Sequence, residues 1–158
     1  MNVAVVDHGA GNLVSVTNAL TTIGARPRIV TQPADLAAAD AIVLPGVGAT
    51  GPAMDELTRT GIAETLTNWE GPFLGICVGL QLLFDSSDED DGPCLGLIEG
   101  RVHKTEGKPL PHMGWNEVSH TDDPLFDGIP DGEAFYFAHS YAPKPADGDA
   151  VIATTTHG

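Results

Sequence analysis

One cysteine stands in a sequence frame that suits a nucleophile. Cys77 lies between Gly75 and Gly79, after the apolar run 72–76 and before a second apolar segment at 78–84. A strand, Gly-x-Cys-x-Gly and a helix form the thiol version of a nucleophile elbow, a tight turn that lifts the nucleophile clear of a sheet. Side chains two residues away on either side would collide there, so the residues at both positions must be small. Because the unpaired N–H groups at the start of the helix favour a thiolate, the pattern predicts a reactive Cys77 rather than a buried core thiol.

The other cysteine has no such frame. Cys94 follows the acidic run 85–91, and we predict a structural role for it. Two cysteines, one of them in a reactive frame, favour a reducing compartment over a disulfide scaffold. The opening apolar segment 2–6 is too short for a signal peptide and has no basic leader, and no apolar stretch could span a bilayer. We therefore expect a cytoplasmic protein.

The charge balance is strongly acidic. The 22 Asp and Glu residues oppose 7 Lys and Arg, which gives a net charge of −15. This charge argues against nucleic acids and anionic membranes as partners. The carboxylates are scattered, with one dense run at 85–91, and lysines are nearly absent. Carboxylates scattered along the whole sequence indicate adaptation to a salty environment more than a binding site. The sequence therefore favours a halophile-like acidic surface over a patch for one basic partner.

The elements that must position Cys77 alternate between strand and helix. Buried or short apolar runs predict strands at 1–6, 28–31, 41–44 and 72–76. Helical spacing and turn residues predict helices after Asn12 and at 34–39, 52–59, 62–69 and 78–84. Gly24 is the expected stop of the first helix. Shorter strand-like runs follow at 97–103, 115–119, 134–137 and 151–155.

This order predicts one domain over residues 1–158, because the length suits a single core. The expected fold class is α/β, with an open, mostly parallel, doubly wound sheet of flavodoxin-like type. Antiparallel strands are expected to be added to that sheet in the C-terminal half.

Three loops are candidates for ligand chemistry. The segment 9–12 begins like a dinucleotide-binding motif, but Val14 stands where the third glycine belongs, so we exclude that site. The turn Pro-Gly-Val-Gly at 45–48 ends a predicted strand, at the sheet edge where ligands bind, and is a candidate oxyanion donor. The acidic run 85–91 lacks the spacing of a calcium loop, so we expect a solvated loop and no metal.

Two later segments combine histidine with aromatic residues. They are 111–116 (Pro-His-Met-Gly-Trp-Asn) and 136–141 (Tyr-Phe-Ala-His-Ser-Tyr). A histidine in such a setting is usually a hydrogen-bonded structural residue. Aromatic residues beside a catalytic edge are also typical of protein interfaces. The residues alone leave both interpretations open.

Together these motifs resemble the triad-type (class I) glutamine amidotransferases. More narrowly, the chain is similar to the glutaminase subunits of imidazole glycerol phosphate synthase. The elbow is shared by the whole class, whereas 112–116 and the opening 9–12 narrow the resemblance to this subunit. The likeness covers nearly the whole chain at matching spacing, in segments 7–15, 45–48, 72–84, 97–102, 111–116 and 136–141.

The resemblance implies that glutamine is hydrolysed to glutamate and that the ammonia passes to a partner. This partner would be a (β/α)₈ cyclase subunit, paired one to one, that makes imidazole glycerol phosphate and an aminoimidazole carboxamide ribotide in histidine biosynthesis. No cofactor and no metal are implied.

The resemblance also assigns roles to residues of this chain, with Cys77 as the nucleophile that forms a thioester. The implied oxyanion donors are the backbone N–H groups of Gly46, Val47 and Val78. The implied substrate contacts are Gln81, His139, Ser140 and Tyr141. The implied partner-facing positions are Asn12, Ser15, Trp115 and Tyr141.

The chain departs from the family in its general base. The family takes this histidine, with an orienting glutamate, from a His-Pro-Glu segment near the C-terminus, and no His-x-Glu occurs here. His157 has no carboxylate after it. We expect a C-terminally truncated, incomplete domain with negligible activity, since loss of a triad member costs several orders of magnitude. Lesser departures are His8, Val78 and Glu99, where the family usually has tyrosine, leucine and proline.

Two alternatives stay open. One is an amidotransferase subunit of another synthase, of the anthranilate or aminodeoxychorismate type, against which segment 113–116 speaks. The other is a non-catalytic partner module that keeps the fold and has lost its base.

Overall fold

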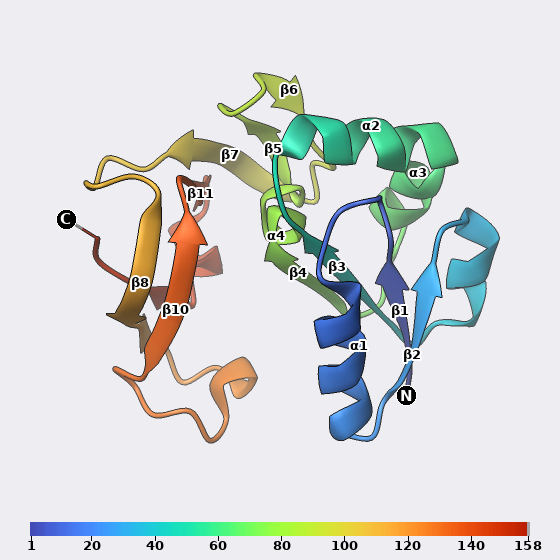
Figure 1. Ribbon diagram of the computed structural model, residues 1–158, viewed down its shortest axis with the longest axis horizontal. Coiled ribbons are helices and arrows are strands. Elements are labelled where there is room, and N and C mark those ends of the chain that lie inside the picture. The colour runs from blue at the N-terminus through green and yellow to red at the C-terminus, as the bar shows by residue number, and fades with distance from the viewer. Residues whose placement is uncertain (158) are drawn as a thin grey trace.

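A parallel sheet of four strands, in the order β2-β1-β3-β4, carries the first half of the chain (Figure 1). The structure is a computed structural model that describes residues 1–157; Gly158, the end of the predicted domain, lies outside them. The strands are β1 Asn2–Val6, β2 Arg26–Val30, β3 Ala41–Gly46 and β4 Phe73–Cys77. All six residues of β3 are buried, as its unbroken apolar character predicted.

The two faces of this sheet are covered unequally. One face packs its β1 and β3 side chains against the helices α2 Thr50–Thr60 and α3 Ile62–Thr67, where Leu57, Ile62 and Leu66 are fully buried. The opposite face meets α1 Leu13–Thr22, none of whose residues is buried. The sheet is therefore doubly wound, as predicted, with most of its apolar burial on the α2 and α3 side. A short 3₁₀ helix, η1 Pro33–Ala38, follows β2.

The ends of α1 follow the predicted signals. Asn12 caps the helix, since its Oδ1 accepts the N–H of Ser15 at 3.1 Å. Gly24 follows the helix with φ +82, a left-handed conformation that glycine adopts without strain. No helix among residues 1–157 combines the length and apolar character needed to cross a membrane.

The second half of the chain forms sheets of its own. One has the order β11-β7-β5-β6, and β8 pairs with β10 (Figure 1). The short strands β9 and β12 form a further pair. The bounds are β5 Phe84–Ser87, β6 Gly92–Pro93, β7 Ile98–Lys104, β8 His112–Glu117, β9 Ser119–His120, β10 Ala134–His139, β11 Tyr141–Pro145 and β12 Ala153–Thr154, with 3₁₀ helices η2 Pro124–Phe126 and η3 Gly148–Ala150. The α/β fold class is thus confirmed, but the added strands do not extend the parallel sheet. β11 lies outside the runs that predicted strands.

The helix predicted over 78–84 is shorter than expected. It is α4 Val78–Gln81, and Phe84 already opens β5. The carbonyls of Leu82, Leu83 and Phe84 accept hydrogen bonds from backbone N–H groups of residues 95–98. Since these donors come from outside the helix, they end it after one turn.

The prediction of a solvated acidic loop at 85–91 is wrong in part. Residues 84–87 are β5, and the carboxylates have partners. Arg101 forms ion pairs with Asp88 and with Asp91, and His103 contacts Asp88 at 2.8 Å. The Arg101 guanidinium, with a smaller effect from His103, lowers the pKa of the Asp88 carboxyl. The acidic run is therefore tied to β7 by opposite charge.

Candidate active site

Cys77 occupies a strained turn between β4 and α4. Its φ of 56 and ψ of −116 lie outside the regions that L-residues favour. A Cβ atom at Gly75 would lie 2.6 Å from Cα of Leu80, and one at Gly79 would lie 1.7 Å from the carbonyl oxygen of Leu44. Both positions must therefore be glycine, and the elbow geometry predicted around Cys77 is confirmed.

The Pro-Gly-Val-Gly turn lies beside this elbow. Gly46 is in register with Cys77 in the β3–β4 ladder. A Cβ at Gly46 would lie 2.9 Å from Cβ of Val78 and 3.3 Å from Nε2 of His8. The buried His8 donates its Nε2–H to the carbonyl of Pro45 at 2.8 Å, which anchors the turn. The expected oxyanion donors thus adjoin Cys77, and Val47 is the exposed residue that follows Gly46.

Cys77 opens into a cleft of about 720 Å³ between two walls. The elbow wall consists of Cys77, Leu80 and Gln81. The opposite wall, called the histidine wall below, is formed by His112, Phe137, His139, Tyr141 and His157.

Gln81 links the two walls of the cleft. The side chain is buried, and its Nε2 donates to the carbonyl of Tyr141 at 3.2 Å. Its Oε1 is buried without a hydrogen-bond partner among residues 1–157. A buried polar atom of this kind is a candidate acceptor for a ligand N–H.

The histidine wall is held by a continuous chain of hydrogen bonds. His112 and His139 face each other across the β8–β10 ladder, and Nδ1 of His112 lies 3.1 Å from Nε2 of His139. His139 Nδ1 contacts the carbonyl of Tyr141 at 3.0 Å, and His112 Nε2 contacts Oδ1 of Asn116 at 2.7 Å. Asn116 Nδ2 then donates to the carbonyl of Thr156 at 2.7 Å. The two histidines of this wall are thus connected through Asn116 to the C-terminal segment at Thr156.

The sequence profile of the family described as "Glutamine amidotransferase class-I" matches residues 4–158. The chain belongs to the class-I glutamine amidotransferases. Two relatives of this amidotransferase are described as imidazole glycerol phosphate synthase subunit HisH. The one from Synechococcus sp. (strain JA-3-3Ab) is 46% identical over 166 residues, covering 100% of this chain and 77% of the relative. The one from Dehalococcoides mccartyi (strain CBDB1) is 43% identical over 162 residues, covering 99% and 79%.

Solved structures share the fold of the amidotransferase. PurLQS from Thermotoga maritima has a TM-score of 0.74 at 21% identity, covering 99% of this chain and 75% of that chain. A glutamine amidotransferase from Thermotoga maritima has a TM-score of 0.64 at 18% identity, covering 92% and 63%. At this level of identity the likeness shows the fold alone.

The amidotransferase brings some of the expected substrate contacts together and leaves one apart. Gln81, His139 and Tyr141 line the cleft with Cys77. Ser140 does not line it, and its carbonyl accepts hydrogen bonds from the backbone N–H and Oγ1 of Thr105.

Two further histidines, His112 and His157, line the cleft although the sequence predicted no site role for either. A site role for His112 could be predicted only from its position opposite His139, and this position is known only once β8 and β10 are paired. The ring of His157 stacks on that of His112 with centroids 3.9 Å apart.

Cys94 is consistent with its predicted structural role. It is half-buried and packs against the core cluster, and burial raises the pKa of its thiol. A buried thiol of raised pKa is a poor nucleophile at neutral pH.

The expected partner-facing positions lie on different elements. Asn12 caps α1, and Ser15 is exposed on the same helix. Trp115 on β8 is 70% exposed and meets the ring of Tyr136 edge-on at 5.6 Å. Tyr141 is half-buried in the histidine wall. Of the four, Trp115 presents the largest apolar surface.

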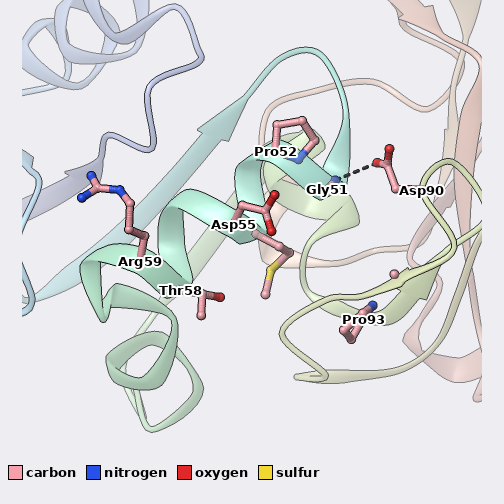
Figure 2. Close-up of a pocket in the computed structure, with 9 residues that line it drawn as sticks. Gly51, Pro52, Asp55, Thr58, Arg59, Asp90 and Pro93 are labelled. Carbon is pink, nitrogen blue, oxygen red and sulfur yellow. Dashed lines mark hydrogen bonds between the residues drawn. The ribbon is translucent and has the colours of Figure 1, made fainter.

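A second hollow, of about 690 Å³, lies between α2 and the β5–β6 hairpin (Figure 2). At its rim, Asp90 Oδ2 accepts the N–H of Gly51 at 2.7 Å and the hydroxyl of Thr50 at 3.1 Å. Asp90 therefore caps the N-terminus of α2. Among the described residues, neither a cysteine nor a histidine lines this hollow, in contrast to the cleft at Cys77.

Proposed function

We propose that this amidotransferase is the glutaminase subunit of an imidazole glycerol phosphate synthase and supplies ammonia to a cyclase partner in histidine biosynthesis. The observation that carries the proposal is the strained Cys77 elbow, which opens into a cleft shared with Gln81 and Tyr141. The identity of 46% to a HisH subunit supports this synthase over others.

In the proposed reaction, Cys77 Sγ attacks the carboxamide carbon of glutamine. The C–N bond breaks, the nitrogen takes up a proton and leaves as ammonia, and a glutamyl thioester remains on Cys77. Water then hydrolyses the thioester to glutamate and restores the thiol. Backbone N–H groups of Val78 and of the Gly46–Val47 turn would stabilise the oxyanion in both steps. Gln81 and the backbone at 139–141 would hold the substrate.

The proposed triad is Cys-His-Glu, but its last two members have no counterpart in the 158 residues. His157 lines the cleft, yet its Nε2 contacts the carbonyl of Pro109 at 2.9 Å, and no carboxylate contacts its ring among the described residues. Within residues 1–157, the activating feature adjacent to Cys77 is the start of α4, a helix of four residues. We therefore propose that this chain alone hydrolyses glutamine several orders of magnitude more slowly than a chain that contains the His-x-Glu segment.

The proposed partner is a (β/α)₈ cyclase subunit, bound one to one. The proposed contact positions are Asn12, Ser15, Trp115 and Tyr141. Exposed aromatic residues such as Trp115 are enriched at protein interfaces.

The test of this function compares two chains, each mixed with the cyclase subunit. One is the 158-residue chain, and the other is extended through a His-x-Glu segment. We expect glutamate release from the extended chain only, and equal rates from both would refute the proposed triad. Cys77→Ser should abolish the release, whereas Cys94→Ser, the matched control, should leave it within about twofold.

Labelling with a glutamine-analogue electrophile distinguishes a chain with a reactive Cys77 thiol from a non-catalytic partner module. The electrophile should label Cys77 and spare Cys94, which is half-buried. The alternative of another synthase is tested by the partner that copurifies with the chain. An anthranilate or aminodeoxychorismate synthase subunit in place of the cyclase would exclude the proposed pathway.

A further inference from the structure

The hydrogen-bonded chain in the histidine wall ends on a backbone carbonyl at both sides. Carbonyls of Tyr141 and Thr156 can only accept, so each must receive a proton from its neighbour. At one end this fixes a proton on Nδ1 of His139. At the other end it fixes the amide of Asn116, because Nδ2 must face Thr156 and Oδ1 must face His112.

The hydrogen bonds of the histidine wall require one more proton than two neutral imidazole rings carry. Oδ1 of Asn116 accepts, so Nε2 of His112 must carry a proton. His139 Nδ1 carries another, and the contact of 3.1 Å between the two rings needs a third. Two neutral imidazoles carry one N–H each. Three protons on two rings correspond to one net positive charge.

The surroundings of His112 favour a cation there. Its ring is buried and stacks with that of Phe137, at a centroid distance of 5.1 Å, and with that of His157, at 3.9 Å. A cation within about 6 Å of an aromatic face is attracted by the ring quadrupole. Both nitrogens of His112 also have partners, which offsets the cost of burying the charge.

We propose that His112 and His139 share one excess proton, as a singly charged imidazole–imidazolium pair that positions the segment 139–141 beside Cys77. The carbonyl of Tyr141 accepts from both His139 and Gln81, so the pair holds the main chain to which Gln81 is tied. His112 and His139 are thus positioning residues for the substrate, a role that rests on the proposed glutaminase function. Raising the pH removes the shared proton and breaks the link between the two rings.

The other ionisable groups that line this cleft are Cys77, Glu106, Tyr141 and His157. Glu106, in the loop before β8, is the acidic side chain among them, and a negative charge there would favour the charged pair. The stacked ring of His157 would disfavour it if it were protonated.

Two histidines elsewhere in the chain give internal standards for the proton count. His120 lies between two carbonyls, with Nδ1 2.8 Å from that of Thr121 and Nε2 3.1 Å from that of Ile129. By the same rule its ring needs two protons, and its hydrogen bond to the Thr121 carbonyl raises its pKa. His8 contacts a single carbonyl, that of Pro45, and its Nδ1 has no partner among residues 1–157, so one proton suffices.

The direct test is a count of protonated ring nitrogens in the ¹⁵N-labelled 158-residue chain at pH 7, by NMR. We expect three protonated nitrogens for His112 and His139 together, two for His120 and one for His8. A count of two or of four for the pair overturns the proposal. This measurement involves no glutamine turnover, so its result is independent of the proposed function.

Asn116 supplies the matched variants. Asn116→Leu removes the acceptor at Nε2 of His112 and should lower the count for the pair from three to two, with His120 unchanged. Asn116→Asp keeps an acceptor for Nε2 of His112, although it loses the N–H donated to the Thr156 carbonyl, and should keep three. An unchanged count in Asn116→Leu would contradict the proposal, and the wild-type count decides it if this variant does not fold.

The positioning role is tested in the complete synthase, with a chain that includes the His-x-Glu segment. Asn116→Leu should raise KM for glutamine about tenfold, the size of one hydrogen bond, with kcat within about twofold. In the wild type, KM should rise on the alkaline side. A fall in kcat at unchanged KM would refute positioning, while a synthase that does not hydrolyse glutamine at all would refute the proposed function and leave the proton count standing.

Discussion

The two walls of the cleft are stabilised in different ways. Of the hydrophobic side chains buried in residues 1–157, all but Val118 precede residue 103, so the elbow wall is backed by the main core. Along β10 the residues are alternately exposed and half-buried, and the histidine wall depends on ring stacking and hydrogen bonds. Apolar packing responds to volume, whereas polar networks respond to protonation and to the loss of single partners. The backbone around Cys77 is thus fixed by steric limits, whereas the histidine wall is fixed by directional contacts.

The largest effect is expected where steric exclusion is strongest. Gly79→Ala places a methyl group 1.7 Å from the Leu44 carbonyl oxygen, so the elbow must distort. We expect a loss of about 4 kcal/mol or more in the free energy of unfolding, measured by denaturant titration. Gly128→Ala is the control, because its φ is +82 and nothing lies within 4 Å of the added Cβ. It should cost only about 1 kcal/mol, and similar losses for the two variants would remove the steric explanation.

The core behind the elbow wall and the rings of the histidine wall should differ in their contribution to stability. Leu57→Ala empties a fully buried position and should cost about 3 kcal/mol. Phe137→Ala removes a half-buried ring that stacks on His112, and should cost about 1 kcal/mol. Chemical denaturation of both variants checks this order. If Phe137→Ala proved the more destabilising, the histidine wall would have to be treated as part of the core.

Trp115 tests whether the exposed side of β8 serves a partner. The side chain is 70% exposed, so Trp115→Ala should change the free energy of unfolding by no more than about 0.5 kcal/mol. We expect it to weaken binding of the cyclase subunit by about 2 kcal/mol, roughly 30-fold in Kd, measured by calorimetry. Leu125→Ala, at a 60% exposed residue of η2, is the matched control and should leave Kd unchanged.

The smallest effects concern pH and have opposite signs at Asp88 and at His120. The pKa of Asp88 is lowered chiefly by Arg101, so its stabilisation is present above the unfolded pKa and is lost as the pH falls through the folded one. The pKa of His120 is raised chiefly by its bond to Thr121, so its stabilisation is present below the unfolded pKa and is lost as the pH rises through the folded one. Measured as Tm from about pH 3 to 9, Asp88→Asn should flatten only the acidic limb and His120→Gln only the neutral-to-alkaline limb. A variant that flattened the other limb would show that the wrong group had been assigned.

What the sequence could predict follows the same division. The apolar run at 41–44 and the glycines around Cys77 predicted β3 and the elbow, because packing and steric limits act on neighbours in sequence. The helix predicted over 78–84 is present only at 78–81, since a short apolar run suits a helix or a buried strand, and hydrogen bonds from residues 95–98 decide where the helix ends. The prediction of a solvated loop at 85–91 was wrong in part for a similar reason, because the partner of Asp88, Arg101, is distant in sequence.

The histidine wall was the least predictable part of the site. His112 and His139 are 27 residues apart and meet only through the β8–β10 register. Hydrogen bonds of this kind leave no periodic trace in the sequence. The motif at 136–141 did place His139 and Tyr141 in the site, through its resemblance to a known family rather than through spacing.

The backbone conformation at Cys77 favours one residue for stability and another for reactivity. Glycine reaches a φ of 56 freely, whereas any other residue stores about 1–3 kcal/mol of strain there. Selection for heat resistance alone would therefore favour glycine at this position and erase the thiol. Selection for stability acts against a cysteine at this position. A lineage that keeps the cysteine must therefore be under selection for the chemistry of its sulfur.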